Sequence, residues 1–123
     1  MAFLFENLRV YQKAVEFADT IITLTQTFPR GFYFLADQLN RAATSVPDNI
    51  AEGNGRFTKA DRKHFFIISR GSLLECVPLL DIAHRKQLLN DTAHQSLREQ
   101  IESISKMVSG LIKGADRRSS QPS

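Results

Sequence analysis

Five basic side chains gather between residues 54 and 71, and together they could contact a phosphate backbone. These five bases face one acid, Asp61, so the stretch carries a local charge of +4, although the whole chain carries only +3. Lysine and arginine neutralise phosphates and release counterions, which makes binding sensitive to salt. A solvated helix face would carry the same residues. The candidate nucleic-acid-binding residues of this stretch are Arg56, Lys59, Arg62, Lys63 and Arg70.

The spacing of these residues predicts a common face. On a helix, Lys59, Lys63 and Arg70 fall within about 40° of one another, with Arg62 to one side and Arg56 just before the helix. Aromatic residues in the same stretch could stack on nucleobases, but we expect them in the hydrophobic core. These aromatic residues are Phe57, Phe65 and Phe66.

No residue pattern typical of catalysis or metal binding is found. His64, His84 and His94 are widely separated and form neither a Glu-x-x-His pattern nor an i, i+4 pair. Cys76 is the only cysteine, which excludes an internal disulfide, and its apolar surroundings predict a buried side chain. The Gly53-Asn54-Gly55-Arg56 segment matches no phosphate-binding glycine pattern and favours a turn. We therefore expect no catalytic residue, metal, cofactor or small-molecule substrate.

Three charged residues lie where the pattern predicts partial burial. Arg70 and Glu75 stand in a strongly apolar stretch, and Glu52 ends the second helical segment. A buried charge is costly unless it is paired. We expect structural ion pairs inside the bundle, in which the two acids meet arginines or the free amides of helix ends.

The composition is that of one globular domain. A chain of 123 residues can bury a core without a disulfide, and its 42% hydrophobic and 24% charged residues are ordinary values. No apolar run is long enough to cross a bilayer, and no export signal precedes the first helix. We expect a cytoplasmic protein without a membrane partner.

Apolar residues recur with the period of an α-helix in four segments, and none alternates as a half-buried strand does. The expected helices cover residues 7–28, 33–53, 58–89 and 91–113. Four helices with short connections predict an all-α, antiparallel up-down-up-down four-helix bundle over residues 1–113. Residues 114–123 are polar and without periodicity, and we expect a disordered tail.

Local signals mark the helix ends. Thr58 and Asp61 have the spacing of a capping box, so the third helix should begin close to Thr58. Asn90 or Thr92 should cap the fourth helix. Pro47 predicts a kink in the second helix, or a break with a restart one residue later, because proline lacks a backbone donor. Pro78 should bend the third helix for the same reason.

The apolar surface is larger than one copy can bury. In the segment 7–28 the apolar arc covers roughly half of the circumference, wider than the stripe of ~100° that a surface helix needs. The segment 65–83 is apolar around most of its circumference. Both patterns predict a homo-oligomer. Three aromatic residues at the start of the second helix could cap the bundle or meet a neighbouring subunit, namely Phe32, Tyr33 and Phe34.

Four segments carry a distinctive pattern, namely residues 5–14, 37–53, 55–56 and 70–75, which include the runs Asn49-Ile50-Ala51-Glu52-Gly53 and Gly71-Ser72-Leu73-Leu74-Glu75. These segments closely resemble the four-helix-bundle proteins encoded in intervening sequences of bacterial 23S rRNA genes. The resemblance implies four antiparallel helices in each subunit and a ring of subunits, typically a homopentamer. A related branch, the accessory variability determinant of diversity-generating retroelements, is a basic pentamer that engages a reverse transcriptase and nucleic acid.

The residues of this motif have a mechanical explanation. Gly71 would admit a neighbouring helix, and Ser72 could form a hydrogen bond across that contact. Glu52, Arg56 and Glu75 could form a polar lock between the second and third helices. The proposed structural motif consists of Asn49, Glu52, Gly53, Gly71, Ser72 and Glu75.

Two functions remain open. The first is a non-catalytic oligomeric scaffold that binds RNA or a ribonucleoprotein through the surface from Arg56 to Arg70. Arg41 is a further candidate contact, although Asn40 beside it stands where the resemblance leads us to expect a basic residue. The alternative is a protein–protein adaptor that uses exposed aromatic or apolar surface, for instance Phe32 and Tyr33, and binds no nucleic acid.

Overall fold

The computed structural model describes residues 3–119, and over this range the chain forms helices and no strand. The four long helices are α1 (Arg9–Thr25), α2 (Tyr33–Asn54), α3 (Lys59–Arg85) and α4 (Asp91–Ser119). Two short 3-10 helices, η1 (Leu4–Asn7) and η2 (Arg30–Phe32), precede α1 and α2. The prediction of an all-α chain with four long helices is confirmed.

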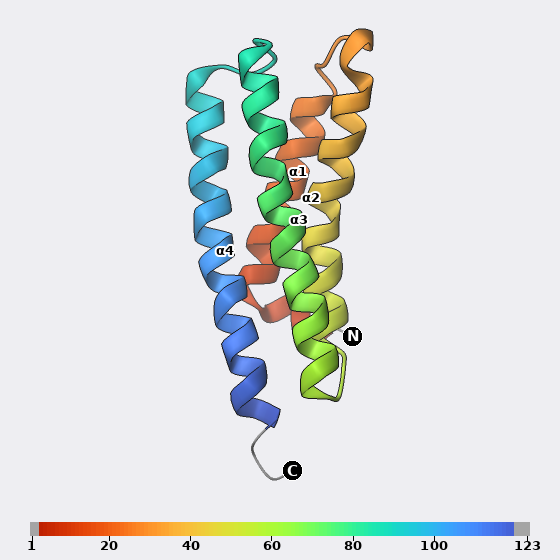
Figure 1. The fold of residues 1–123 in the computed structure, drawn as a ribbon, viewed down its shortest axis with the longest axis vertical. Coiled ribbons are helices and arrows are strands. Elements are labelled where there is room, and N and C mark those ends of the chain that lie inside the picture. The colour runs from red at the N-terminus through yellow and green to blue at the C-terminus, as the bar shows by residue number, and fades with distance from the viewer. Residues whose placement is uncertain (1–2, 120–123) are drawn as a thin grey trace.

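Successive helices pack side by side. α2 packs on α1 and on α3, and α3 packs on α4, whereas α1 and α4 touch more sparingly. In Figure 1, α1 and α3 rise while α2 and α4 descend, so each connection lies at one end of the molecule. The α2–α3 loop shares the lower end with the last turns of α4, and the other two connections lie at the upper end.

The core is one apolar cluster to which all four long helices contribute. Its members on the first and last helices are Val10, Ala14, Phe17, Ala18 and Ile21 of α1 and Leu97, Ile101, Ile104, Val108 and Ala115 of α4. Part of the apolar surface stays outside this core. Val15 and Ile22 of α1 are exposed, as are Ile67, Leu74 and Ile82 of α3. These two helices are the ones whose wide apolar arcs predicted burial on more than one side.

Side-chain caps fix the starts of α3 and α4. The Thr58 hydroxyl accepts a hydrogen bond from the Asp61 backbone amide at 3.1 Å, and α3 begins one residue after Thr58, close to the predicted position. The Asn90 side-chain oxygen accepts from the Ala93 amide at 2.8 Å, so Asn90 is the cap of α4. Each bond satisfies an amide that has no partner inside its helix.

Three helix ends differ from the predicted bounds. α1 and α3 end three and four residues earlier than expected, and Gln87 just after α3 has a left-handed φ of 63°. α4 continues to Ser119, so residues 114–119 are helical and do not belong to a disordered tail. Ala115 is buried and extends the apolar seam of α4 into this part. Residues 120–123 of the expected tail lie outside the described range.

α2 runs through Pro47 without a break, so the predicted restart after it does not occur, and α3 is likewise continuous through its proline. Side chains support the turn that precedes Pro47. The Asn49 amide donates to the Ser45 carbonyl at 2.8 Å, and the Ser69 hydroxyl of α3 donates to the Val46 carbonyl at 2.8 Å. Pro47 leaves the Ala43 carbonyl without its helical donor, and these two bonds hold the neighbouring carbonyls of Ser45 and Val46.

Candidate nucleic-acid interface

Arg62 holds the α2–α3 loop from inside. Its side chain is 6% exposed, and Nη1 donates to the carbonyl oxygens of Arg56 at 3.0 Å and Phe57 at 2.7 Å. A buried guanidinium is tolerated when such hydrogen bonds replace its water. We expected Arg62 among the phosphate contacts, but its burial removes it from that set. Its charge instead fixes the conformation of the loop.

The same loop presents an aromatic ring to solvent. Phe57 is 95% exposed, contrary to the expectation that it lies in the core, whereas Phe66 is buried as expected. Arg56 places its guanidinium 4.7 Å from the centroid of the Phe65 ring, and it pairs with Glu52 at 2.8 Å. Glu52 therefore meets an arginine as predicted, but the ion pair lies on the surface and not inside the bundle.

The other basic residues of the stretch 54–71 turn toward α4. The ammonium groups of Lys59 and Lys63 lie 3.9 Å and 3.2 Å from one carboxylate oxygen of Asp116. Arg70 is half-buried and donates to the Ser109 hydroxyl at 3.2 Å. Exposed ion pairs of this kind contribute less than about 1 kcal/mol, so solvent and polyanions can compete for both lysines.

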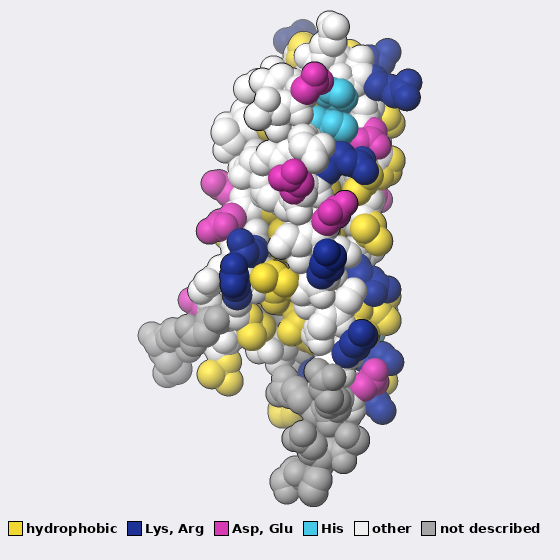
Figure 2. Space-filling view, turned by 90° about the vertical axis from the view of Figure 1, so that its left-hand side faces the viewer, with side chains coloured by type: hydrophobic (Ala, Val, Ile, Leu, Met, Phe, Trp, Pro, Cys, Tyr) yellow, Lys and Arg dark blue, Asp and Glu magenta, His cyan; other side chains and the backbone are white. Residues whose placement is uncertain are grey.

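α4 adds two exposed lysines to this side of the molecule, Lys106 and Lys113. Lys106 stands three residues before Ser109, the partner of Arg70. Lys113 stands three residues before Asp116, the partner of Lys63. Figure 2 shows Lys and Arg side chains outnumbering acidic ones in the lower half of the α4 side. The two lysines were not among the predicted contacts, although their i, i+7 spacing indicates a common helix face.

Arg41 does not join this group. It is exposed on α2, one turn before Ser45, whose hydroxyl meets Ser72 of α3 at 2.8 Å. Lys63 lies nine residues from Ser72 toward the opposite end of the bundle. At 1.5 Å per residue, Arg41 and Lys63 are therefore roughly 20 Å apart along the bundle axis.

Gly53, and not Gly71, provides the close contact between helices. A Cβ atom on Gly53 would lie 2.5 Å and 2.7 Å from two ring carbons of Phe66 and 3.2 Å from the Arg62 carbonyl oxygen. A Cβ atom on Gly71 would meet nothing within 4 Å, so the role that we predicted for it is wrong within one subunit. The absence of a side chain at Gly53 allows α2 and α3 to approach at the lower end.

The polar part of the motif is only partly as predicted. Ser72 forms its predicted bond across the α2–α3 contact to Ser45, whose hydroxyl also accepts from the Asn49 amide at 2.9 Å. Glu75 is exposed and takes no part in the Glu52–Arg56 ion pair. Its helix turn lies well above the level at which α3 meets the end of α2, so the predicted three-residue lock does not form.

Two of the three histidines, which looked separate in the sequence, meet at the upper end of the bundle. The His84 and His94 rings stack at 4.1 Å with 3° between their planes. His84 contacts Asp91 at 2.6 Å, and His94 contacts Asp81 at 2.8 Å. The hydrogen bond from His94, together with the nearby charge of Arg98, lowers the pKa of Asp81. Within residues 3–119 no three His, Cys, Asp or Glu side chains are grouped to hold a metal ion.

Cys76 is fully buried, as predicted. Burial, with a smaller effect of the neighbouring Glu75 charge, raises the pKa of its thiol to about 12. The thiol also donates weakly to the Ser72 carbonyl at 3.5 Å. A protonated, enclosed thiol is a poor nucleophile, and Cys76 therefore acts as an apolar core residue.

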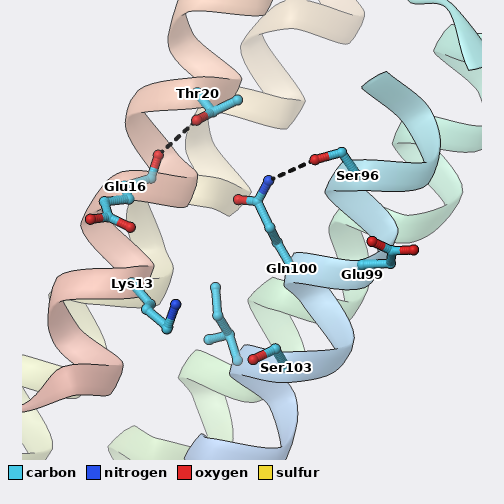
Figure 3. A pocket seen from close by; sticks show the side chains of 8 residues that line it. Lys13, Glu16, Thr20, Ser96, Glu99, Gln100 and Ser103 are labelled. Atoms are coloured by element: carbon cyan, nitrogen blue, oxygen red, sulfur yellow. Dashed lines mark hydrogen bonds between the residues drawn. The ribbon is translucent and has the colours of Figure 1, made fainter. Parts of the chain in front are cut away.

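A polar groove of about 480 Å³ separates α1 from α4. It is lined by Lys13, Glu16, Thr20, Ser96, Glu99, Gln100, Ser103 and Ile104. In Figure 3, Thr20 bonds to the Glu16 carbonyl at 2.9 Å and Gln100 bonds to Ser96 at 3.3 Å, each within its own helix. The groove mixes both charges and lacks the apolar walls of a small-molecule site. A membrane-spanning segment is absent from the helices of residues 3–119.

Comparisons with known proteins agree with this architecture. One solved structure, from Bacteroides thetaiotaomicron VPI-5482, is that of a protein of unknown function from the S23 ribosomal protein family. Its similarity has a TM-score of 0.78 at 24% identity, over 85% of this chain and 95% of that chain, and at this identity it concerns the fold alone. A comparison with curated proteins gave no match. Residues 6–110 match the family of 23S rRNA-intervening sequence proteins, and the chain therefore belongs to that family.

Proposed function

We propose that this protein is a non-catalytic, oligomeric scaffold of the cytoplasm that binds RNA or a ribonucleoprotein through a basic surface. The basic surface consists of Arg56, Lys59, Lys63, Arg70, Lys106 and Lys113. The observation that carries the proposal is that bases of α3 and α4 lie on one side of the bundle, where Asp116 pairs with two of them, and that Arg56 of the α2–α3 loop adds a cation at the same lower end. Such a surface attracts the phosphates of a nucleic acid.

Titration of a labelled single-stranded RNA at several salt concentrations tests this function. If all six side chains neutralise phosphates, log affinity should fall against log salt with a slope of about −4, since each contact on a single strand contributes about −0.7. The double variant Lys59→Glu/Lys63→Glu should weaken binding at least about tenfold and flatten the slope. Arg41→Glu, which reverses an exposed charge far from the surface, serves as the matched control. Absent or salt-independent binding would overturn the function.

The scaffold is proposed to be a homo-oligomeric ring of antiparallel bundles, with five subunits as the family resemblance implies. An uncovered apolar stripe on α3 supports self-association, because its residues recur along one helix face. The α3 stripe consists of Ile67, Gly71, Leu74, Pro78 and Ile82, all of them exposed. Exposed apolar surface that is continuous in this way favours burial against another protein surface. Native mass measurement, with and without cellular RNA, would give the subunit number.

The alternative function, a protein–protein adaptor without nucleic acid, is favoured by a different observation. Tyr33 and Phe34 are 55% and 60% exposed at the start of α2, whereas Phe32 is half-buried against the core. The start of α2, which carries these residues, lies at the upper end, opposite the α2–α3 loop (Figure 1). An adaptor of this kind would lose its protein partner when both exposed rings are replaced by serine, and the charge reversal at Lys59 and Lys63 would leave that interaction intact.

A further inference from the structure

We propose that Phe57 is a stacking platform for an unpaired nucleobase, so that the RNA bound by the basic surface is single-stranded where it meets the α2–α3 loop. This inference rests on the proposed function and names the class of RNA. Its starting point is the exposure of the Phe57 ring, which at 95% is the largest among the exposed hydrophobic side chains of residues 3–119.

The loop that carries Phe57 is held in place at every residue. The Gly55 amide donates back to carbonyls of the last turn of α2, and the Arg56 amide donates to the Gly53 carbonyl at 3.3 Å. Arg62 binds the carbonyls of Arg56 and Phe57, and Thr58 caps α3. The ring is therefore presented by a fixed backbone, which lowers the conformational entropy lost when a ligand stacks on it.

The cations around Phe57 suit contact with a nucleic acid better than insertion of the ring into an apolar pocket of another protein. Arg56 precedes it directly, Lys59 follows two residues later, and Lys63 lies one turn further along α3, with side chains that are about one-third to one-half exposed. Aromatic rings among cations are typical of proteins that bind single strands, because every base has a face on which a ring can stack. In a continuous RNA duplex the bases are stacked on one another and cannot reach such a ring.

The experiment measures binding of a ten-nucleotide single-stranded RNA and of an RNA duplex to the full chain and its variants. Phe57→Ala should weaken binding of the single strand about five- to hundredfold, the range for loss of one base–aromatic stack, and leave the salt slope unchanged. Phe57→Leu keeps an apolar side chain without a π-face, and its affinity for the single strand should fall nearly as much. Phe34→Ala, which removes an exposed ring at the opposite end, is the matched control.

A fluorescent variant gives a second measurement that does not depend on loss of binding. The chain contains no tryptophan, so Phe57→Trp introduces a single reporter. Its emission should be quenched by the single strand and not by the duplex, while affinity stays close to that of the unmodified protein. Phe34→Trp should report no quenching with either RNA.

Each contrary result overturns the stacking proposal in a recognisable way. Unchanged affinity in Phe57→Ala, with binding still sensitive to Lys59→Glu/Lys63→Glu, would leave the proposed function intact and eliminate stacking. Full affinity in Phe57→Leu would identify an apolar contact without stacking. A change in subunit number in Phe57→Ala would assign the ring to another copy of the chain. No binding of either RNA by the unmodified protein would remove the proposed function as well.

Discussion

Arg62 and Lys63 are adjacent in the chain, yet their charges have different surroundings. Arg62 is buried and donates to two loop carbonyls, whereas Lys63 reaches Asp116 at the surface. Water stabilises the charge of Lys63, but Arg62 depends on the protein groups that replace water. Removal of the Arg62 side chain should therefore lower the stability of the fold much more than removal of the Lys63 side chain.

Replacing Arg62 with methionine should lower the free energy of unfolding by about 2–4 kcal/mol. The variant keeps much of the buried volume but leaves the Arg56 and Phe57 carbonyls without their charged donor, and hydrogen bonds to a charged group contribute about 1.5–3 kcal/mol each. Urea unfolding followed by circular dichroism gives the measurement. Lys63→Met is the control, with an expected change within about 0.5 kcal/mol. Equal stability of the two variants would contradict a supporting role for Arg62.

Gly53→Ala should destabilise the protein by about 1–2 kcal/mol, although alanine is the better helix former. The new Cβ atom would lie 2.5 Å from a ring carbon of Phe66, which is buried and cannot move away freely. Overpacking of this kind costs about 1–3 kcal/mol. Gly110→Ala in α4 is the matched control, because nothing lies within 4 Å of its Cβ position, and it should stabilise by up to about 1 kcal/mol. Thermal unfolding of the two variants distinguishes the effect of packing on stability from the effect of helix propensity.

Residue types alone could not show which of these positions are buried, which are exposed and which contact a neighbouring helix closely. The sequence predicted the basic character of the α3 face correctly, and it predicted the Ser72 bond and the burial of Cys76. It did not reveal that Arg62 points inward, that Phe57 points outward or that Gly53 is the close contact. Each of these depends on where α2 lies against α3, and helix periodicity defines the faces of a helix without defining its neighbours.

At the scale of elements, the upper ends of α3 and α4 are joined by a charged cluster. Asp81 of α3 accepts hydrogen bonds from His94 at 2.8 Å and from Arg98 at 3.1 Å, both on α4. The stacked ring of His84 lies against His94. These bonds hold the two helices together below the α3–α4 connection, and they are stronger while Asp81 is ionised.

The lowered pKa of Asp81 predicts a loss of stability in acid. Because the folded pKa lies below the ordinary value of 3.8, ionised Asp81 stabilises the fold above that value, and the contribution disappears as the pH falls through the folded pKa. The effect should stay below about 1 kcal/mol, since the pair is partly exposed. Urea unfolding from pH 6 to pH 2 should show that Asp81→Asn is less stable than the unmodified protein at pH 6 and that the difference shrinks toward pH 2.

A second variant tests the cause of that shift. His94→Leu removes the hydrogen bond that lowers the pKa of Asp81 most and keeps the carboxylate. The stability difference between pH 6 and pH 2 should become smaller in this variant than in the unmodified protein. An unchanged difference would assign the acid sensitivity to other carboxylates.

The elements themselves were largely predictable, because their signals are local. The caps at Thr58 and Asn90 act within one turn, and the apolar seams of α1 and α4 are visible as periodic residues. The length of α4 was underestimated because Gly114 and the polar residues after it resemble a tail, whereas Ala115 continues the seam. A kink or a break at Pro47 was expected from local chemistry, and α2 continues through this residue without a break.

At the scale of the whole molecule, two neighbouring surfaces are the proposed binding sites for RNA and for other copies of the chain. The basic surface lies along α3 and α4 toward the lower end, and the α3 stripe carries apolar residues on another part of the same helix. Lys63 and Ile67 are one turn apart, so the two surfaces adjoin. A ring closed through the α3 stripe would repeat the basic surface once per subunit, and repeated sites on one RNA raise the overall affinity without any new contact. Assembly and RNA binding should thus be coupled.

Leu74→Glu should dissociate the proposed ring without unfolding the subunit. Leu74 is 48% exposed at the centre of the α3 stripe, so one subunit tolerates a polar side chain there, whereas an apolar interface would have to bury a charge. The dissociation constant should rise at least about 100-fold, equivalent to about 2.7 kcal/mol. Sedimentation velocity gives the subunit number, and circular dichroism checks that the helices persist. Phe34→Glu, the same kind of change at the upper end, should leave the assembly intact. If Phe34→Glu dissociates and Leu74→Glu does not, the interface lies at the aromatic residues and not at the α3 stripe.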